Sequence, residues 1–349
     1  MKAAVWYGVK DIRVEEKELR ELRDHEVTVR VAWAGICGSD LHEYEEGPVF
    51  VPVDAPNDLT GEVAPITMGH EFSGVVEAVG KHVTKYKVGD RVVVNPTLTY
   101  GKKHEELDIY DGFSFIGLSG DGGFAHFANV PEANVYALPE SLTLQDGALV
   151  EPMAVAVQAV KEADMRFGDT VAVFGVGPIG LLTIIAAKAA GASKILAFDL
   201  SDERLNKAKE LGATHIFNSG KVKPAEAVRK EVPDGVDVTF EVAGVGPTFQ
   251  SAIEVTRARG TMVIVSIFAR PIEWNPMMLT NTGVKVTSTI AYSPTSFQQT
   301  IDLMGTGQIK PQGIITSKIP LEEIVASGFE ALTNDKTQAK ILVELSGEF

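Results

Sequence analysis

The chain has 349 residues, of which 45% are hydrophobic and 23% charged, so its length predicts two domains that each bury a core. The formal net charge of −15 disfavours nucleic acid and anionic membranes as partners. One cysteine cannot form an internal disulfide, no signal segment is recognised, and glycine and proline break the longest apolar run, 171–187. A cytoplasmic protein without a membrane span is therefore expected.

The first part of the chain, to about residue 155, is predicted to be mostly β. Short apolar or alternating runs are separated by clusters of Gly, Asp and Pro, which is typical of strands joined by turns. The clearest runs cover residues 2–7, 28–33, 73–79, 91–94 and 124–130.

The octapeptide 35–42 follows the second of these runs and gathers Cys37, Ser39, Asp40 and His42. Glycines on both sides of Cys37 permit a tight turn. A thiolate ligand, a hydroxyl that passes protons and a titratable imidazole in one turn indicate metal-assisted proton transfer. The alternative is a buried structural cysteine in a loop, because free cysteine is often a small core residue.

Two further segments add candidate metal ligands. His70 and Glu71 stand at the start of a strand, after an irregular segment, 43–67, that is predicted to be a functional loop, with a solvated insertion as the alternative. Glu151 interrupts an apolar run, where its burial would be costly without a partner. Cys37, His70 and Glu151 are suitable zinc ligands with one position open, which Glu71 could fill. Their spacing is too loose to be a zinc motif by itself.

The pattern changes after residue 169. An apolar strand, 170–174, a glycine-rich turn, a helix over 181–190 and a second strand, 194–198, form a βαβ dinucleotide fingerprint that ends at Asp199. The glycines supply the turn, the approach to the pyrophosphate and close helix packing, and the helix N-terminus favours the phosphates. Asp199 favours NAD, because its carboxylate would repel the 2′-phosphate of NADP. The residues assigned to this end of the cofactor are Gly175, Gly177, Pro178, Ile179, Gly180, Asp199 and Leu200, with Arg204 nearby as a charge on a helix surface that Ser201 caps.

Three later strands, 236–241, 261–266 and 284–290, continue the α/β pattern. The loops after them should lie at the carboxyl edge of a parallel sheet and meet the nicotinamide end of the cofactor. The residues assigned there are Val242, Ala243, Ser266, Ile267, Ile290, Ala291 and Tyr292. Residues 294–349 are too few for a domain, so the predicted division is 1–155 with 294–349 for the catalytic domain and 156–293 for the NAD domain.

The chain resembles the zinc-dependent medium-chain alcohol dehydrogenases. The motifs that carry the resemblance are Gly-Ile-Cys-Gly-Ser-Asp-Leu-His at 35–42, Gly-His-Glu-Phe-Ser-Gly at 69–74, Val-Gly-Asp-Arg-Val at 88–92 and Val-Glu-Pro at 150–152. Within the family, the stretch 42–71 is similar to that of the (R,R)-type 2,3-butanediol dehydrogenases. The resemblance implies an α/β protein with a GroES-like β domain, a Rossmann domain and a site in the cleft between them.

The resemblance also implies roles for the site residues. Zinc lowers the pKa of the alcohol, Ser39 takes the proton and passes it through the nicotinamide ribose to His42 and then to water, while hydride passes to NAD. The reverse reaction reduces acetoin to butanediol. The implied ligands are Cys37, His70 and Glu151, with Glu71 exchangeable and Asp40 as partner of the His70 ring.

The chain departs from many members of the family in the region that corresponds to a structural zinc site. Many relatives hold a structural zinc with four clustered cysteines, but the corresponding region, 95–120, has none, so one catalytic zinc per chain and a lobe held by packing alone are expected. An alternative function is that of a polyol dehydrogenase of the sorbitol type or a threonine dehydrogenase, which share the zinc ligands. An alternative of another class is a metal-free reductase-like or NAD-sensing protein. A homodimer or homotetramer is expected, and the stereochemistry of the substrate is left open.

Overall fold

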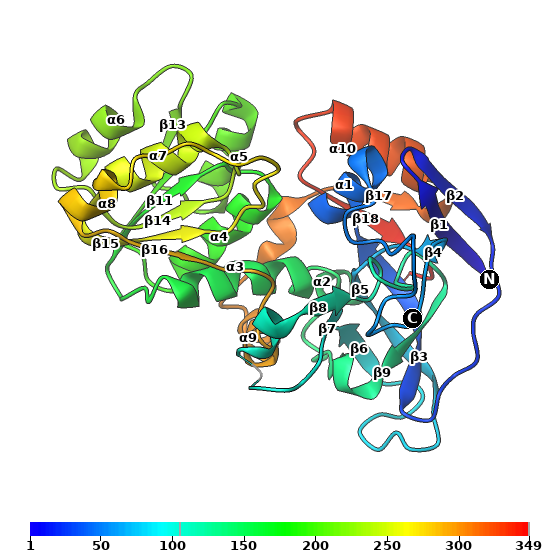
Figure 1. Ribbon diagram of the computed structural model, residues 1–349. Helices are drawn as coiled ribbons and strands as arrows, with labels where there is room; N and C mark the ends of the chain where they lie inside the picture. The colour runs from blue at the N-terminus through cyan, green and yellow to red at the C-terminus, as the bar shows by residue number, and fades with distance from the viewer. Residues whose placement is uncertain (105, 348–349) are drawn as a thin grey trace. The chain divides into compact units, whose positions relative to one another are not determined.

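The computed structural model describes residues 1–104 and 106–347, and the chain divides into two compact units (Figure 1). The first unit contains residues 1–152, 293–307 and the segment that begins at Ile315. The second contains residues 153–292 and 308–314. The short segment 308–314 thus packs with the second unit, through η3 (Pro311–Ile314) against α4 (Pro178–Ala189), whereas the sequence analysis assigned it to the first domain.

The first unit is built on sheets whose strands pair antiparallel, except for β17 and β18, which pair in parallel. Its largest sheet has the strand order β10-β6-β5-β3-β18-β17, with β9 also paired to β3. A second sheet has the order β2-β1-β4, and β7 pairs with β8 alone. The strands are β1 (Lys2–Gly8), β2 (Asp11–Glu16), β3 (Glu26–Gly35), β4 (Ile66–Thr67), β5 (Glu71–Val79), β6 (Arg91–Val94), β7 (Thr97–Thr99), β8 (Phe113–Phe115), β9 (Phe127–Pro131), β10 (Val135–Ala137), β17 (Ile315–Pro320) and β18 (Lys340–Glu344).

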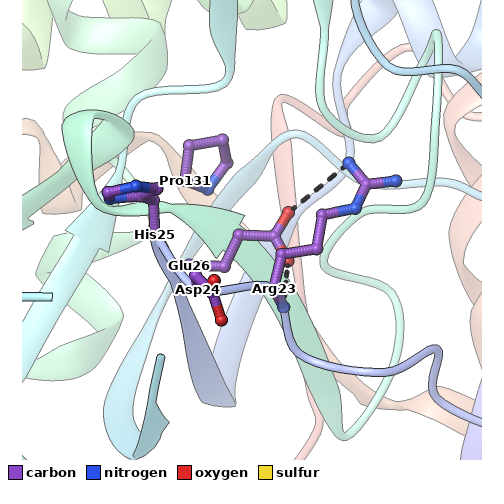
Figure 2. A pocket seen from close by; sticks show the side chains of 5 residues that line it. All are labelled: Arg23, Asp24, His25, Glu26 and Pro131. Carbon is purple, nitrogen blue, oxygen red and sulfur yellow. Dashed lines mark hydrogen bonds and ion pairs between the residues drawn. The ribbon is translucent and has the colours of Figure 1, made fainter. Parts of the chain in front are cut away.

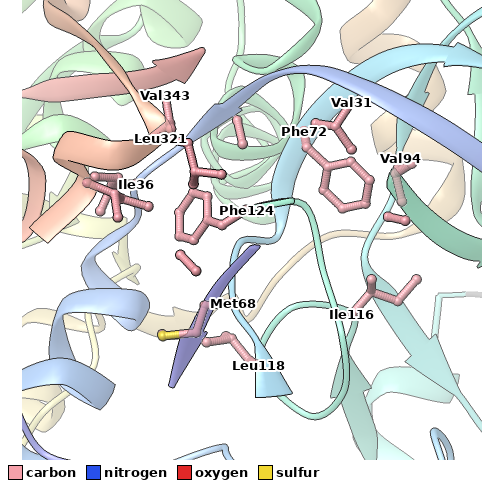
Figure 3. Close-up of a cluster of buried hydrophobic side chains, with 14 of the residues drawn as sticks. Val31, Ile36, Met68, Phe72, Val94, Ile116, Leu118, Phe124, Leu321 and Val343 are labelled. Atoms are coloured by element: carbon pink, nitrogen blue, oxygen red, sulfur yellow. The ribbon is translucent and has the colours of Figure 1, made fainter. Parts of the chain in front are cut away.

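The core of this unit explains why the alternating runs became strands. Inward residues of β3 such as Val27, Val29 and Val31 are fully buried, and residues far apart in the chain pack with them. Figure 3 shows Phe72 and Phe124 in this cluster together with Val343 from the last strand. Because the last strand, β18, contributes side chains to the core of the first unit, the end of the chain belongs to that unit, as the sequence analysis expected.

The helices of the first unit are short. They are α1 (Gly38–Glu46), α2 (Leu144–Gly147), α9 (Pro294–Gly305) and α10 (Glu330–Asn334), with η1 (Asp108–Asp111), η2 (Glu132–Asn134), η4 (Leu321–Glu323) and the π-helix η5 (Ile324–Phe329). α3 (Val150–Glu162) begins in the first unit and continues into the second. It starts two residues before Pro152, and a proline is tolerated in the first turn of a helix because the N–H that it lacks would have no partner there.

The region expected to lack a structural zinc forms a small lobe in its described part, 95–104 and 106–120. β7 and β8 pair antiparallel, and the ring of Phe115 packs edge-on against Phe50 at 6.3 Å and against Phe113 at 5.2 Å. Lys103 Nζ also lies 2.8 Å from Asp111 Oδ1. The sequence analysis expected packing alone to hold this lobe, whereas the structure adds an ion pair. An exposed ion pair contributes little stability, so packing remains the main contribution.

The second unit is a doubly wound parallel sheet, which confirms the predicted Rossmann class. The strand order is β13-β12-β11-β14-β15-β16, and every pair is parallel. α4 contacts α5, while α6, α7 and α8 contact one another in turn, so the helices form two groups (Figure 1). The strands are β11 (Thr170–Phe174), β12 (Lys194–Asp199), β13 (His215–Asn218), β14 (Val236–Glu241), β15 (Thr256–Ile264) and β16 (Lys285–Ser288); the remaining helices are α5 (Asp202–Leu211), α6 (Pro224–Glu231), α7 (Gly246–Val255) and α8 (Met277–Thr282).

Some element boundaries differ from the sequence prediction. β13 was missed, because its four residues are all only partly buried and do not alternate. β15 begins at Thr256, five residues before the predicted 261, and β16 ends at Ser288. The predicted cap of α5 is confirmed, since the Ser201 hydroxyl accepts the N–H of Arg204 at 3.2 Å. In the described part of the chain, no helix is long and apolar enough to cross a membrane.

Candidate active site

Two neighbouring strands bring the candidate metal ligands together. β3 ends at Gly35, just before Cys37, and β5 begins at Glu71, just after His70. The strands are antiparallel with Gly35 opposite Glu71, so the ladder itself sets the three residues side by side. One ligand atom from each of Cys37, His70 and Glu71 lies within 4.8 Å of the others. A sulfur, an imidazole nitrogen and a carboxylate oxygen at this separation fit a zinc ion.

Cys37 does not sit in a simple turn, as the sequence suggested, but at the start of α1. The Asp40 carboxylate explains the helix, because its Oδ2 accepts the N–H of Cys37 at 2.9 Å. The same carboxylate reaches the other ligand, with Oδ1 3.4 Å from His70 Nδ1. Asp40 is completely buried, so it fixes both Cys37 and the ring of His70 from behind.

The ring of His70 is buried and faces its second nitrogen toward the site. Nε2 lies 3.2 Å from Ser39 Oγ. Burial by itself lowers the pKa of His70, but the charges of Asp40 and Cys37 outweigh it, so the pKa is raised well above its ordinary value in the metal-free chain.

Glu71 has a buried cationic partner that the sequence analysis missed. Both of its oxygens accept from Lys340 Nζ at 2.7 Å, and Lys340 also donates to the Ile36 carbonyl at 3.0 Å. Glu71 is 0% and Lys340 2% exposed. Burial lowers the pKa of Lys340, whereas Glu71, Cys37 and Glu151 raise it, and the net change is an increase. A lysine at the start of an apolar strand was the available signal, but its partner is far away in sequence.

Glu151 stands apart from the close set. It is 5% exposed and lies in the first turn of α3, but it is not one of the three residues whose ligand atoms meet within 4.8 Å. Its charge nevertheless acts on Lys340, the partner of Glu71. The structure thus brings Cys37, His70 and Glu71 together directly and places Glu151 in the same electrostatic neighbourhood.

The two candidate proton carriers lie on α1. Ser39 is partly buried beside His70, and His42, one turn further along the helix, is exposed. Residues three apart on a helix are neighbours on its surface. The arrangement therefore offers a hydroxyl at the buried metal ligand and an imidazole at the solvent.

The glycine-rich turn of the second unit has three glycines in three different situations. Gly175 has a φ of +89°, which favours glycine. A Cβ on Gly180 would lie 2.0 Å from the carbonyl oxygen of Gly175, so the helix could not approach as closely with any other residue. At Gly177 no described atom lies within 4 Å of a Cβ position. This open position precedes Pro178 and Ile179 at the start of α4, where the helix dipole favours a phosphate.

Asp199 lies beside this turn. Its Oδ2 accepts the N–H of Val176 at 2.9 Å, and Oδ1 accepts those of Leu200 and Ser201 at 2.8 and 3.0 Å. These bonds hold the carboxylate at the carboxyl end of β12 while it remains partly exposed. Leu200 is 74% exposed, and Arg204 lies in the first turn of α5. The structure thus joins Asp199 to the turn and leaves Arg204 on the next helix.

Two of the three loops expected at the nicotinamide end share a buried anchor, Glu241, that the sequence analysis did not identify. Its Oε1 accepts from the N–H groups of Ala243 and Gly244 at 3.0 and 2.9 Å, and its Oε2 accepts from the Ser266 hydroxyl. Glu241 is 0% exposed at the end of β14. Val242 adjoins this anchor, Ile267 is 63% and Ile290 39% exposed, Ala291 has a φ of +47°, and Tyr292 is buried.

A separate depression of about 560 Å³ involves none of these residues. Arg23, Asp24, His25, Glu26 and Pro131 line it, and Figure 2 shows Arg23 turned toward Glu26. The buried carboxylate of Glu26 is already paired with Arg20 at 2.6 and 2.7 Å and accepts the N–H of Arg23 at 3.0 Å. These groups stabilise the start of β3, and the depression is not part of the candidate active site.

Comparisons with known proteins agree with this geometry. Residues 23–140 match the alcohol dehydrogenase GroES-like domain, and residues 178–306 match the zinc-binding dehydrogenase family. An (R,R)-butanediol dehydrogenase of Bacillus subtilis is 45% identical over 98% of this chain and 99% of its own. A crystal structure of 2R,3R-butanediol dehydrogenase from the same organism has a TM-score of 0.94, with the same coverage. A sorbitol dehydrogenase of Bacillus subtilis is 32% identical over 98% of this chain and 97% of its own.

Proposed function

Because the chain belongs to the zinc-dependent medium-chain alcohol dehydrogenases, we propose that it interconverts 2,3-butanediol and acetoin with NAD as the hydride carrier. Reduction of diacetyl to acetoin is the neighbouring step on the same carbon skeleton. The observation that carries the proposal is the buried set of Cys37, His70 and Glu71, in a chain similar from end to end to a butanediol dehydrogenase.

One zinc ion per chain would be held by Cys37, His70 and Glu151, with Glu71 as the exchangeable ligand. The donor types fit zinc, and two of the three proposed ligands already lie in the close set. When bound, the ion supplies a Lewis acid that lowers the pKa of an alcohol oxygen. Asp40 would keep the ring of His70 oriented through the contact at Nδ1.

The proton of the alcohol would leave along α1. Ser39 is the group within reach of the buried ligand His70, and its hydroxyl can accept one proton while it gives up another. His42 lies one helical turn away at the surface and would release the proton to water. Removal of the proton prepares the carbinol carbon to give up hydride, which NAD accepts.

Selectivity for NAD over NADP follows from Asp199 beside the glycine turn. Its carboxylate can accept hydrogen bonds from the two ribose hydroxyls and would repel a phosphate at the same place. The helix N-terminus at Gly177, Pro178 and Ile179 would receive the pyrophosphate. We assign 156–293 as the NAD domain and 1–155 with 294–349 as the catalytic domain, except for the segment 308–314, which packs with the NAD domain. A homodimer or homotetramer in the cytoplasm is part of the same proposal.

Activity on a polyol is the second candidate, favoured by the similarity to a sorbitol dehydrogenase. The decisive experiment measures NAD reduction with each butanediol stereoisomer, sorbitol and threonine under one set of conditions. We expect the highest kcat/KM with a butanediol stereoisomer, and the winning isomer reports the stereochemistry. A higher kcat/KM with sorbitol or threonine would contradict the butanediol assignment.

A further inference from the structure

The carboxylate of Glu71 occupies a place that two other residues have shaped for it. On one side is Lys340 from β18, whose Nζ lies 2.7 Å from both carboxylate oxygens. On the other side is Gly35 from β3, where a Cβ would lie 2.1 Å from Glu71 Oε2. β3 pairs with β5 through Gly35 and Glu71 and with β18 through Gly35 and Leu342, so all three residues meet on adjacent strands.

Gly35 is not required by the backbone. It is the last residue of β3, and it is not among the residues with positive φ. Alanine would be compatible with the backbone of β3, and the three atoms nearest to the Cβ position all belong to the Glu71 side chain, with carboxylate Oε2 the closest. Because Gly35 has no side chain, the Glu71 carboxylate can occupy the position where a Cβ would otherwise lie.

Lys340 is buried in this arrangement and hydrogen-bonded, like Glu71. Its ammonium donates to the two Glu71 oxygens and to the Ile36 carbonyl, and the side chain is 2% exposed. If the Glu71 carboxylate moved away to bind a metal, the buried ammonium would keep only the neutral carbonyl as an acceptor. Removing one partner of a buried ion pair is costly, because the other charge remains uncompensated. The pair therefore opposes metal binding by Glu71.

We propose that Gly35 and Lys340 form a resting site that withholds Glu71 from the metal and so makes it an exchangeable ligand instead of a permanent one. The inference rests on the proposed function, since it requires a metal at Cys37 and His70. Gly35 and Lys340 are positioning residues, because each acts through the position of the Glu71 carboxylate. A Glu71 oxygen that moved to the metal would weaken or lose its bond to Lys340.

Two substitutions test the resting site by different physical routes. Lys340→Met removes the ammonium while keeping an unbranched side chain, and Gly35→Ala leaves the ammonium but pushes the carboxylate aside. Both should shift Glu71 toward the metal. Lys318→Met, an exposed lysine on the neighbouring strand β17, is the matched control for the first substitution. Gly8→Ala, where a Cβ meets no described atom within 4 Å, is the control for the second.

The measurement uses the full chain with cobalt(II) in place of zinc and follows metal release to a chelator. The absorption spectrum of bound cobalt reports its ligands, and its thiolate band should depend on Cys37. We expect both substitutions to change the visible cobalt bands and to slow release by about tenfold, within the range for groups that orient metal ligands. Adding Glu71→Gln to either variant should restore fast release, and the two controls should match the wild type.

The outcomes separate the inference from the proposed function. Release that stays at the wild-type rate or becomes faster in both variants would overturn the resting site. So would slow release that survives the added Glu71→Gln, because the effect would then not pass through Glu71. A wild-type cobalt spectrum without a Cys37-dependent thiolate band would instead overturn the metal site of the proposed function. If one variant fails to fold, the other decides by the same criteria.

Discussion

Asp40 illustrates how one buried carboxylate organises both sides of a metal site. One oxygen accepts the N–H of Cys37 and so begins α1, and the other faces His70 Nδ1. The resemblance to the family had suggested the second contact but not the first. A short-range pattern of glycines around Cys37 predicted a turn, because the capping effect of a residue three positions later was not considered.

Ser39→Ala should lower turnover while leaving the metal in place. A methyl group cannot take the alcohol proton, and general acid–base steps typically contribute about 10²–10⁴-fold. His42→Ala should lower turnover less, because water can replace an exposed residue at the end of the proton path. The decrease in turnover of this variant should become smaller as pH rises, because hydroxide then takes the proton. Steady-state kcat on butanediol, with zinc content measured on the same samples, checks both.

A different result would assign these two residues a purely local structural role. If Ser39 and His42 only shape the helix start around Cys37, both variants would lose zinc together with activity. Full zinc content and wild-type turnover at pH 7 in Ser39→Ala would rule the proton path out.

Asp199→Ala should weaken the binding of NAD and reduce the preference of the enzyme for NAD over NADP. Charge-assisted hydrogen bonds contribute about 1.5–3 kcal/mol, so NAD should bind roughly 10–100-fold more weakly. Asp202→Ala, an exposed acid at the start of α5, is the control because it lies close by and bonds to Lys221 instead. Fluorescence titration with NADH and NADPH measures the change. Equal kcat/KM for NAD and NADP in the wild type would show that Asp199 does not select the cofactor.

At the scale of elements, the loop 47–65 between α1 and β4 depends on Glu43. This residue is 0% exposed, and its carboxylate accepts the N–H of Val49 at 3.0 Å, of Val51 at 3.2 Å, and of Phe50 between them. The loop has no ladder of its own, so the helix supplies its backbone with acceptors. The sequence analysis predicted an irregular functional segment over 43–67, but residues 43–46 belong to α1 and 66–67 form β4, and it did not identify Glu43 as the anchor.

Glu43→Ala should therefore destabilise the chain and loosen this loop. Three N–H groups lose their acceptor, and unpaired buried groups cost about 1–3 kcal/mol each, so a total of about 2–4 kcal/mol is expected where water reaches some of them. Glu46→Ala on the exposed side of α1 is the matched control. Chemical denaturation and amide exchange at 49–51 provide the measurement. Unchanged protection of these amides would show that Glu43 does not hold the loop.

At the scale of the whole molecule, local patterns predicted what depends on local sequence. The glycine turn, β11, β12 and Asp199 form one contiguous unit, and the structure has them close to the predicted limits. The residue types of Cys37 and His70 suggested a zinc site, and the family resemblance supported their assignment as its ligands. In contrast, the partnership of Lys340 with Glu71 joins residues separated by 269 positions, and neither residue shows it in its own neighbourhood.

Glu241 was missed for a different reason. A carboxylate that closes an apolar strand before a glycine-containing loop was visible in the sequence, and the cost of burying it was the signal. The same reasoning had been applied to Glu151, but the acceptor role of Glu241 toward two loops required knowing that β14 and β15 are neighbours. Strand order is a property of the folded chain, so the sequence alone could not connect Ala243 with Ser266.

The most direct test of the account is zinc content measured together with butanediol oxidation while metal is removed and returned. Extensively dialysed protein should hold one zinc per chain, because region 95–120 carries no cysteine for a second site. Activity should fall in proportion to zinc removed, return in proportion to zinc added up to one per chain, and be absent at every zinc level in Cys37→Ser. Full butanediol activity in the zinc-free chain, or two tightly held zinc ions per chain, would contradict the account.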